Sequence, residues 1–64
     1  VPRMDYAPLE FLVVISQAGL VGEPLLTIGS GWDEVDTFFR AYLVKTYRLG
    51  ERLNPGRYRV LVGP

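Results

Sequence analysis

Hydrophobic residues recur along the chain with two different spacings, and the first is that of β-strands. Residues 9–17, LEFLVVISQ, are rich in β-branched and aromatic side chains and form too short a run for a convincing helix, so they predict a strand. Because this strand is apolar on both faces, we expect it to be central in a sheet. Residues 25–30, LLTIGS, alternate and predict a second strand, and the glycines and proline of residues 18–24 predict a loop between the two. The two strands would form a hairpin with Leu20 and Val21 at its tip.

From residue 32 to residue 49 the hydrophobic spacing becomes helical. Eight side chains fall within an arc of about 140° at about 100° per residue, which predicts one long amphipathic helix. Ser30 is a suitable N-cap with Asp33 three positions on, and Gly50 is a suitable stop. The arc that we expect to pack on the sheet consists of Trp32, Val35, Phe38, Phe39, Tyr42, Leu43, Thr46 and Leu49.

A third strand completes the predicted fold. After a turn at residues 54–56, NPG, residues 57–63 alternate and can run antiparallel beside the apolar first strand. The sequence therefore predicts a small α/β domain of the α+β type, with ββαβ order, a three-stranded antiparallel sheet of order 2-1-3 and one helix on one face. We expect this single domain to span residues 4–64. Residues 1–4 read VPRM, which is similar to the end of a thrombin-type cleavage sequence followed by an initiator methionine. We therefore expect residues 1–3 to be a remnant of such a sequence. The alternative is that the chain is an internal fragment of a longer protein.

The chain is short and contains neither cysteine nor histidine. These two absences exclude disulfide staples and zinc sites built from thiolates or imidazoles. A chain of 64 residues buries only about 60% of the surface that its unfolded form exposes, so its stability is marginal. A tight core, self-association or a larger partner must then supply the stability, and we expect association.

Apolar runs in the sequence are short. The longest unbroken run is residues 11–15, far below the roughly 18 residues of a membrane span, and no basic-then-apolar signal segment opens the chain. We therefore expect a soluble, cytoplasmic protein with no membrane partner. Arginine outnumbers lysine six to one, which favours a GC-rich and thermophilic source.

Candidate catalytic groups are few. Asp33, Glu34 and Asp36 are the candidate acids and bases, yet with no histidine or cysteine and with Lys45 as the only lysine the usual nucleophile and base pairings are missing. The three carboxylates suit the positive end of a helix dipole. The glycine-rich residues 28–32, IGSGW, lack the Gly-Lys-Ser/Thr ending of a phosphate loop. We therefore predict a protein that is not an enzyme and binds no cofactor and no metal.

Charge is distributed unevenly along the chain although the net charge is zero. Residues 1–36 carry one arginine and six carboxylates, a net charge of −5, and residues 37–64 carry six basic residues and one carboxylate, a net charge of +5. The basic half makes nucleic-acid binding the alternative function. It is disfavoured because the chain as a whole is neutral and the strands are expected to expose no aromatic platform. The candidate residues for this alternative are Arg48, Arg52, Arg57 and Arg59.

Protein association is the favoured function. A sheet with one covered face needs a second layer, and arginine and tyrosine are enriched at protein interfaces. We expect a small accessory, regulatory or inhibitor protein, of the kind that viruses and mobile elements encode, that docks on a protein partner, forms a homodimer, or does both. The candidate docking residues on the solvent side of the helix are Arg40, Val44, Tyr47 and Arg48. The candidate self-association residues on the uncovered sheet face are Leu12, Val14, Arg59 and Leu61, with Glu10 expected to reach Arg59 of the mate.

Overall fold

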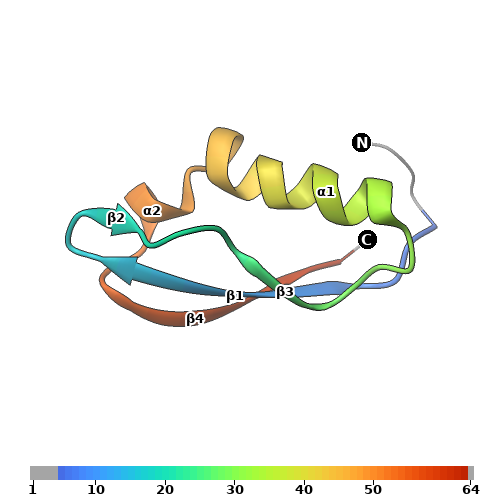
Figure 1. The fold of residues 1–64 in the computed structure, drawn as a ribbon, viewed down its shortest axis with the longest axis horizontal. Helices are drawn as coiled ribbons and strands as arrows, with labels where there is room; N and C mark the ends of the chain where they lie inside the picture. Colours follow the sequence, from blue (N-terminus) through green and yellow to red (C-terminus); the bar gives the residue numbers. More distant parts are fainter. Residues whose placement is uncertain (1–4, 64) are drawn as a thin grey trace.

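A computed structural model of the chain describes residues 5–63 and gives a helical layer on an antiparallel sheet. The expectation for residues 1–3 lies outside the described residues. The helical segments cover one face of the sheet and leave the other face bare (Figure 1). In chain order the elements are β1 (Leu9–Ser16), β2 (Gly19–Leu20), β3 (Leu25–Ile28), α1 (Asp33–Ala41), the π-helical turn η1 (Tyr42–Thr46), α2 (Leu49–Arg52) and β4 (Gly56–Val62).

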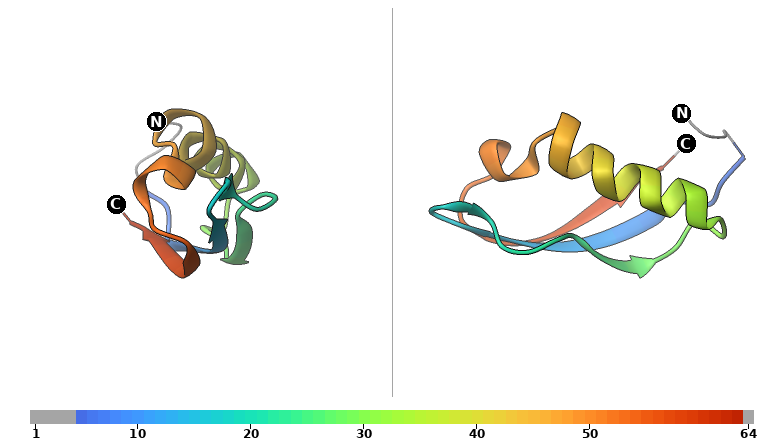
Figure 2. Two further views of the ribbon diagram at one scale, coloured as in Figure 1. Left: turned by 90° about the vertical axis from the view of Figure 1, so that its left-hand side faces the viewer. Right: turned by 45° about the horizontal axis from the view of Figure 1, so that its top comes forward.

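Strand β1 lies at the centre of the sheet. Strand β4 pairs antiparallel with one edge of β1 along its length. Strands β2 and β3 share the other edge, where Ile15 faces Leu20 and Leu12 faces Leu25. The end-on view in Figure 2 shows β4 on one side of β1 and the β2–β3 segment on the other. The predicted fold class is therefore confirmed, with two short strands in place of the single second strand that we expected.

The hairpin after β1 is tighter than the sequence indicated. Gly19 pairs directly with Ser16, so that only two residues form the turn. The Ser16 hydroxyl donates to the Gly19 carbonyl at 3.1 Å and accepts from the Ala18 amide at 3.1 Å. Leu20, expected at an exposed tip, is half-buried against the core, whereas Val21 is exposed.

The long helix predicted for residues 32–49 is broken into three pieces. Within η1 the Tyr47 amide donates to the Tyr42 carbonyl at 2.8 Å, one residue further than in an α-helix. Arg48 then adopts a left-handed conformation with φ of 60°, which ends the first helical run. Gly50 is therefore not the helix stop that we predicted. It lies inside α2, where an added Cβ would sit 2.8 Å from the Leu20 amide nitrogen, so the close approach of α2 to β2 requires a glycine.

The start of α1 also differs from the predicted cap. Trp32 occupies the N-cap position and makes no side-chain cap hydrogen bond. Ser30 stands two residues earlier, where its hydroxyl accepts from the Trp32 amide at 3.1 Å and its own amide donates to Asp36 Oδ1 at 2.9 Å. The carboxylate of Asp36 thus holds the β3–α1 turn against the first turns of the helix.

The core lies between β1 and the helical layer. Alternate residues of β1 point into it, as the strand period requires. Only Val35, Leu43 and Leu49 of the predicted helical arc are buried, and Phe39 packs partly against them. Trp32, Phe38, Tyr42 and Thr46 are exposed, so half of the predicted arc was wrong. The buried apolar set is Tyr6, Leu9, Phe11, Val13, Ile15, Val35, Leu43 and Leu49.

Candidate protein-interaction surfaces

The sheet face that the helices leave bare, called the outer face below, is partly apolar. Leu12 and Val14 of β1 are each 43% exposed, and Leu61 of β4 is 70% exposed. Val21 and Leu25 extend this surface across the other edge of the sheet and were not assigned from the sequence. Four of these side chains, those of Leu12, Val14, Val21 and Leu25, line an open hollow of about 570 Å³. The four residues around the hollow form a continuous apolar surface beside β1, and Leu61 lies on the same face, beyond Arg59.

The charged residues of the outer face are arranged in two ways. Arg59 Nε lies 3.3 Å from Glu10 Oε2 across the β1–β4 pair, and the Thr27 hydroxyl donates to Glu10 Oε1 at 2.7 Å. Glu10 and Arg59, which we expected to meet between two copies, already form an ion pair within one chain. Glu23 and Arg57 also border the hollow, and neither makes an ion pair within the described part of the chain.

A second apolar surface lies between the helical layer and β4. We call it the β4 groove, a hollow of about 570 Å³. The half-buried residues of β4 form its floor, and the rings of Tyr42 and Tyr47 stand on its helical side. The two rings stack with centroids 6.4 Å apart and planes inclined by 28°. The principal residues of the groove are Tyr42, Tyr47, Leu53, Tyr58, Val60 and Val62.

The β4 groove is open because the helical layer is attached toward the opposite edge of the sheet. Arg40 Nε donates to the Pro24 carbonyl at 3.4 Å, and the Asp36 carboxylate holds the Ser30 amide. Both contacts join α1 to the segments that flank β3. Toward β4 the apolar floor remains half-exposed, and within residues 5–63 the outer edge of β4 pairs with no other strand.

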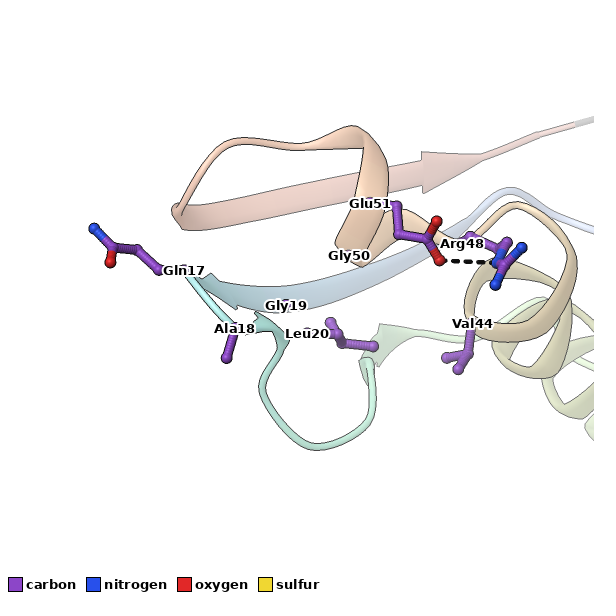
Figure 3. Close-up of a pocket in the computed structure, with 8 residues that line it drawn as sticks. All are labelled: Gln17, Ala18, Gly19, Leu20, Val44, Arg48, Gly50 and Glu51. Atoms are coloured by element: carbon purple, nitrogen blue, oxygen red, sulfur yellow. Dashed lines mark ion pairs between the residues drawn. The ribbon is translucent and has the colours of Figure 1, made fainter.

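The four predicted docking residues do not form one surface. Val44 and Arg48 border a hollow of about 350 Å³ beside β2, where Arg48 Nε lies 2.8 Å from Glu51 Oε2 (Figure 3). Arg40 turns toward the sheet, with its guanidinium carbon 6.0 Å from the centre of the Phe11 ring. Tyr47 lies on the opposite flank, in the β4 groove. Val44 thus borders one hollow with Arg48 and a neighbouring one with Arg40, whereas Tyr47 is separated from the other three.

The four arginines proposed for nucleic-acid binding are likewise separated. Arg48 pairs with Glu51, as described above. Arg52 donates from Nε to the Tyr47 carbonyl at 2.6 Å, and its guanidinium carbon lies 4.5 Å from the centre of the Tyr47 ring. Arg57 and Arg59 project from the outer face of β4. These arginines lie in three different places, so they do not line a single groove.

Two further findings concern other classes of site. Within residues 5–63, no three His, Cys, Asp or Glu side chains are grouped so as to hold a metal ion. Among the described helices, none combines the length and the apolarity needed to cross a membrane.

Sequence reasoning missed the role of the segment before β1. Tyr6 is buried, and its ring lies 5.5 Å from that of Phe39. A single aromatic residue before a strand has no periodic neighbours, so no spacing marks it as core. Comparison with known proteins provides no further assignment, because no family model matches the chain, and neither a curated protein nor a solved structure shows significant similarity to it.

Proposed function

We propose that the protein is a non-enzymatic binding module that associates with a second copy of itself through the outer face of its sheet, and that it acts as a small accessory or regulatory protein. The observation that carries the proposal is the group of five exposed apolar side chains on a sheet face that no element within residues 5–63 covers. These side chains belong to Leu12, Val14, Val21, Leu25 and Leu61.

Energetics favour covering this face. Complete removal of a leucine or valine side chain from water contributes roughly 1.5–3 kcal/mol, and these residues are about half exposed, so each would gain on the order of 1 kcal/mol. A domain of this size has a net stability of only about 5 kcal/mol. Five such gains in each of two copies total about 10 kcal/mol, which is comparable to the roughly 4–15 kcal/mol that association costs.

Symmetry also favours a second copy as the occupant. Two identical sheets that pack face to face about a two-fold axis bring the same patch together, so the surface must be complementary to itself. Glu23 and Arg57 lie on opposite sides of the hollow and carry opposite charges. A two-fold axis through the hollow would direct Glu23 of one copy toward Arg57 of the other, which supports a closed dimer with the helices outside.

Size-exclusion chromatography coupled to light scattering tests the proposal. We expect a mass near twice the 7.2 kDa of the chain, falling toward the monomer on dilution. Val14→Asp places a charge in the middle of the face and should shift the midpoint of this dilution curve to higher concentration by at least about tenfold. Val44→Asp, a similarly exposed valine on the helical layer, is the matched control and should leave the curve unchanged.

Two outcomes would contradict the proposal. A constant mass near 7.2 kDa at all concentrations would mean that the outer face is solvated. Equal effects of the two substitutions would mean that association uses another surface. The nucleic-acid alternative is tested on the same samples, because binding to phosphates would weaken steeply with salt and would lose part of that dependence in an Arg57→Ala, Arg59→Ala variant.

A further inference from the structure

We infer that the open edge of β4 accepts an extended peptide segment in which apolar and acidic residues alternate. The segment would add a strand antiparallel to β4. Its apolar side chains would enter the β4 groove, and its carboxylates would meet the arginines of β4. This site lies at the free edge of β4 and does not depend on dimer formation, although Arg57 and Arg59 also border the outer face.

The first support is the backbone of β4. This strand is seven residues long, and within the described residues 5–63 it pairs with β1 on one edge and with no strand on the other. An edge strand presents unpaired amide and carbonyl groups in a regular array, and extended peptides bind such edges by main-chain hydrogen bonds. The strand is long enough for a bound segment to make several of these bonds.

The second support is the side-chain period of β4. Tyr58, Val60 and Val62 point toward the groove and are half-buried, whereas Arg57 and Arg59 point to the outer face and are exposed. Residues opposite each other in an antiparallel pair have their side chains on the same face. A strand added beside β4 would therefore place every second side chain against an apolar floor and the others beside Arg57, Arg59 and Leu61.

The helical side of the groove also favours an apolar occupant. The rings of Tyr42 and Tyr47 border the groove, and Leu53 also lines it. Tyrosine provides a large contact area for little conformational entropy, which makes exposed tyrosines effective binding groups. These side chains would cover the inward-facing residues of the added strand.

The distribution of charge favours the edge of β4 over that of β3 as the binding edge, and it favours an acidic segment as the partner. The side chain of Arg59 is 70% exposed although it pairs with Glu10, and Arg57 makes no ion pair within residues 5–63. The guanidinium of Arg52 covers the Tyr47 ring at the groove wall. The other open edge, that of β3, is preceded by Glu23 and followed by the carboxylates of α1, so it would repel an acidic segment. Strand β4 of a second copy would also be an unfavourable occupant, because its Arg57 and Arg59 would lie beside the same two arginines of the first copy.

Fluorescence polarisation with labelled seven-residue peptides tests the inference. The probe is acetyl-Val-Glu-Val-Glu-Val-Glu-Val-amide, and the controls are the same peptide with lysine for glutamate and a peptide of the same composition in blocks. We expect the alternating acidic peptide to bind at least about tenfold more tightly than either control. Binding of all three peptides with equal affinity, or of none, would overturn the inference.

Matched variants locate the site. Arg57→Glu should weaken binding of the acidic peptide at least about tenfold, whereas Lys45→Glu, the same charge change on the exposed helix surface, should not alter it. Tyr47→Ala should weaken binding while leaving the unfolding midpoint nearly unchanged, and Val44→Ala is its control on the opposite flank of η1.

Amide hydrogen exchange provides the structural readout. Bound peptide should slow exchange at alternate amides of β4, because those that face the open edge gain partners. Protection at β3 or on the outer face instead would contradict the inference. A Leu25→Asp variant, which charges the outer face on the β3 side and away from Arg57, should bind the peptide as the unaltered chain does, so failure of the dimer and failure of the peptide site can be told apart.

Discussion

Tyr42 and Tyr47 stack across the π-helical turn with their ring centroids 6.4 Å apart. Residues five apart on an α-helix point in directions about 140° apart, so these two rings would lie on different faces of the helix that the sequence predicts. The extra residue per turn in η1 brings the second ring back over the first. Two tyrosines that the helical period assigns separately, one to the core and one to solvent, thus form one wall of the β4 groove.

Substitutions of Arg48 test the break that follows this turn. Its left-handed conformation costs about 1–2 kcal/mol for a residue with a Cβ, and glycine removes that cost. Arg48→Gly loses an exposed ion pair with Glu51, worth at most about 1 kcal/mol, so its stability should match or exceed that of the natural sequence. Arg48→Val should lose at least about 1 kcal/mol, since β-branched residues disfavour this conformation. Urea unfolding measures both.

The order of the two Arg48 variants is the decisive outcome. In a continuous helix glycine would be the worse residue, by about 1 kcal/mol relative to good helix formers. A glycine variant less stable than the valine variant would therefore mean that the helix runs through residue 48.

Gly50→Ala tests the packing of α2 on the hairpin. The added methyl group would lie 2.8 Å from the Leu20 amide nitrogen and 3.3 Å from the Leu20 Cβ, so one of the two segments must move. Overpacking of this kind costs about 1–3 kcal/mol, which lowers the melting temperature of a small domain by at least about 4 °C. Thermal unfolding followed by circular dichroism measures the change.

Gly63→Ala is the control for this substitution, because an added Cβ there would meet only Pro8 Cβ at 4.0 Å. Its melting temperature should stay close to that of the natural sequence. Equal melting temperatures for the two variants would show that α2 does not press on β2.

A comparison of Phe38 with Val35 tests which helical residues form the core. Val35 is fully buried and Phe38 is 37% exposed, although both belong to the arc that the period assigns to the core. Val35→Ala should cost roughly 2 kcal/mol, and Phe38→Ala about 1 kcal/mol despite the larger group removed. Chemical denaturation of the two variants gives the difference, and a larger loss for Phe38→Ala would place its ring inside.

The sequence predicts strands well and the helix poorly in this chain, for physical reasons. A run rich in β-branched and aromatic residues such as residues 9–17 fits a pleated, buried strand, and the strand period of two assigns its side chains to faces. The helical arc is wrong at Trp32, Phe38 and Tyr42, before any break, because the helix buries a stripe narrower than the predicted arc. After Tyr42 the π turn and the left-handed Arg48 also change the rotation. The prediction that Leu49 is buried is correct only because the break in the helix returns this residue to the core.

The candidate surfaces could likewise be predicted where strand alternation applies, and not where they depend on loops or on the broken helix. Leu12, Val14 and Leu61 could be placed on an exposed sheet face because strand alternation fixes their side. Val21 lies in the segment between β2 and β3, where no side-chain period applies. Its position on the outer face could therefore be found only from the structure. The β4 groove depends on the turn at η1 and on the hydrogen bonds that hold α1 toward β3, and neither has a sequence signature.

Isotope-filtered nuclear Overhauser spectroscopy on a mixture of labelled and unlabelled protein tests the proposed dimer most directly, because it detects only contacts between copies. At concentrations where light scattering gives a dimer mass, we expect intermolecular cross-peaks among the methyl groups of Leu12, Val14 and Leu25. Methyl groups of Val60 and Val62, on the helical side of the sheet, should show none. Intermolecular contacts confined to those two valines, or to the helical layer, would contradict association through the outer face.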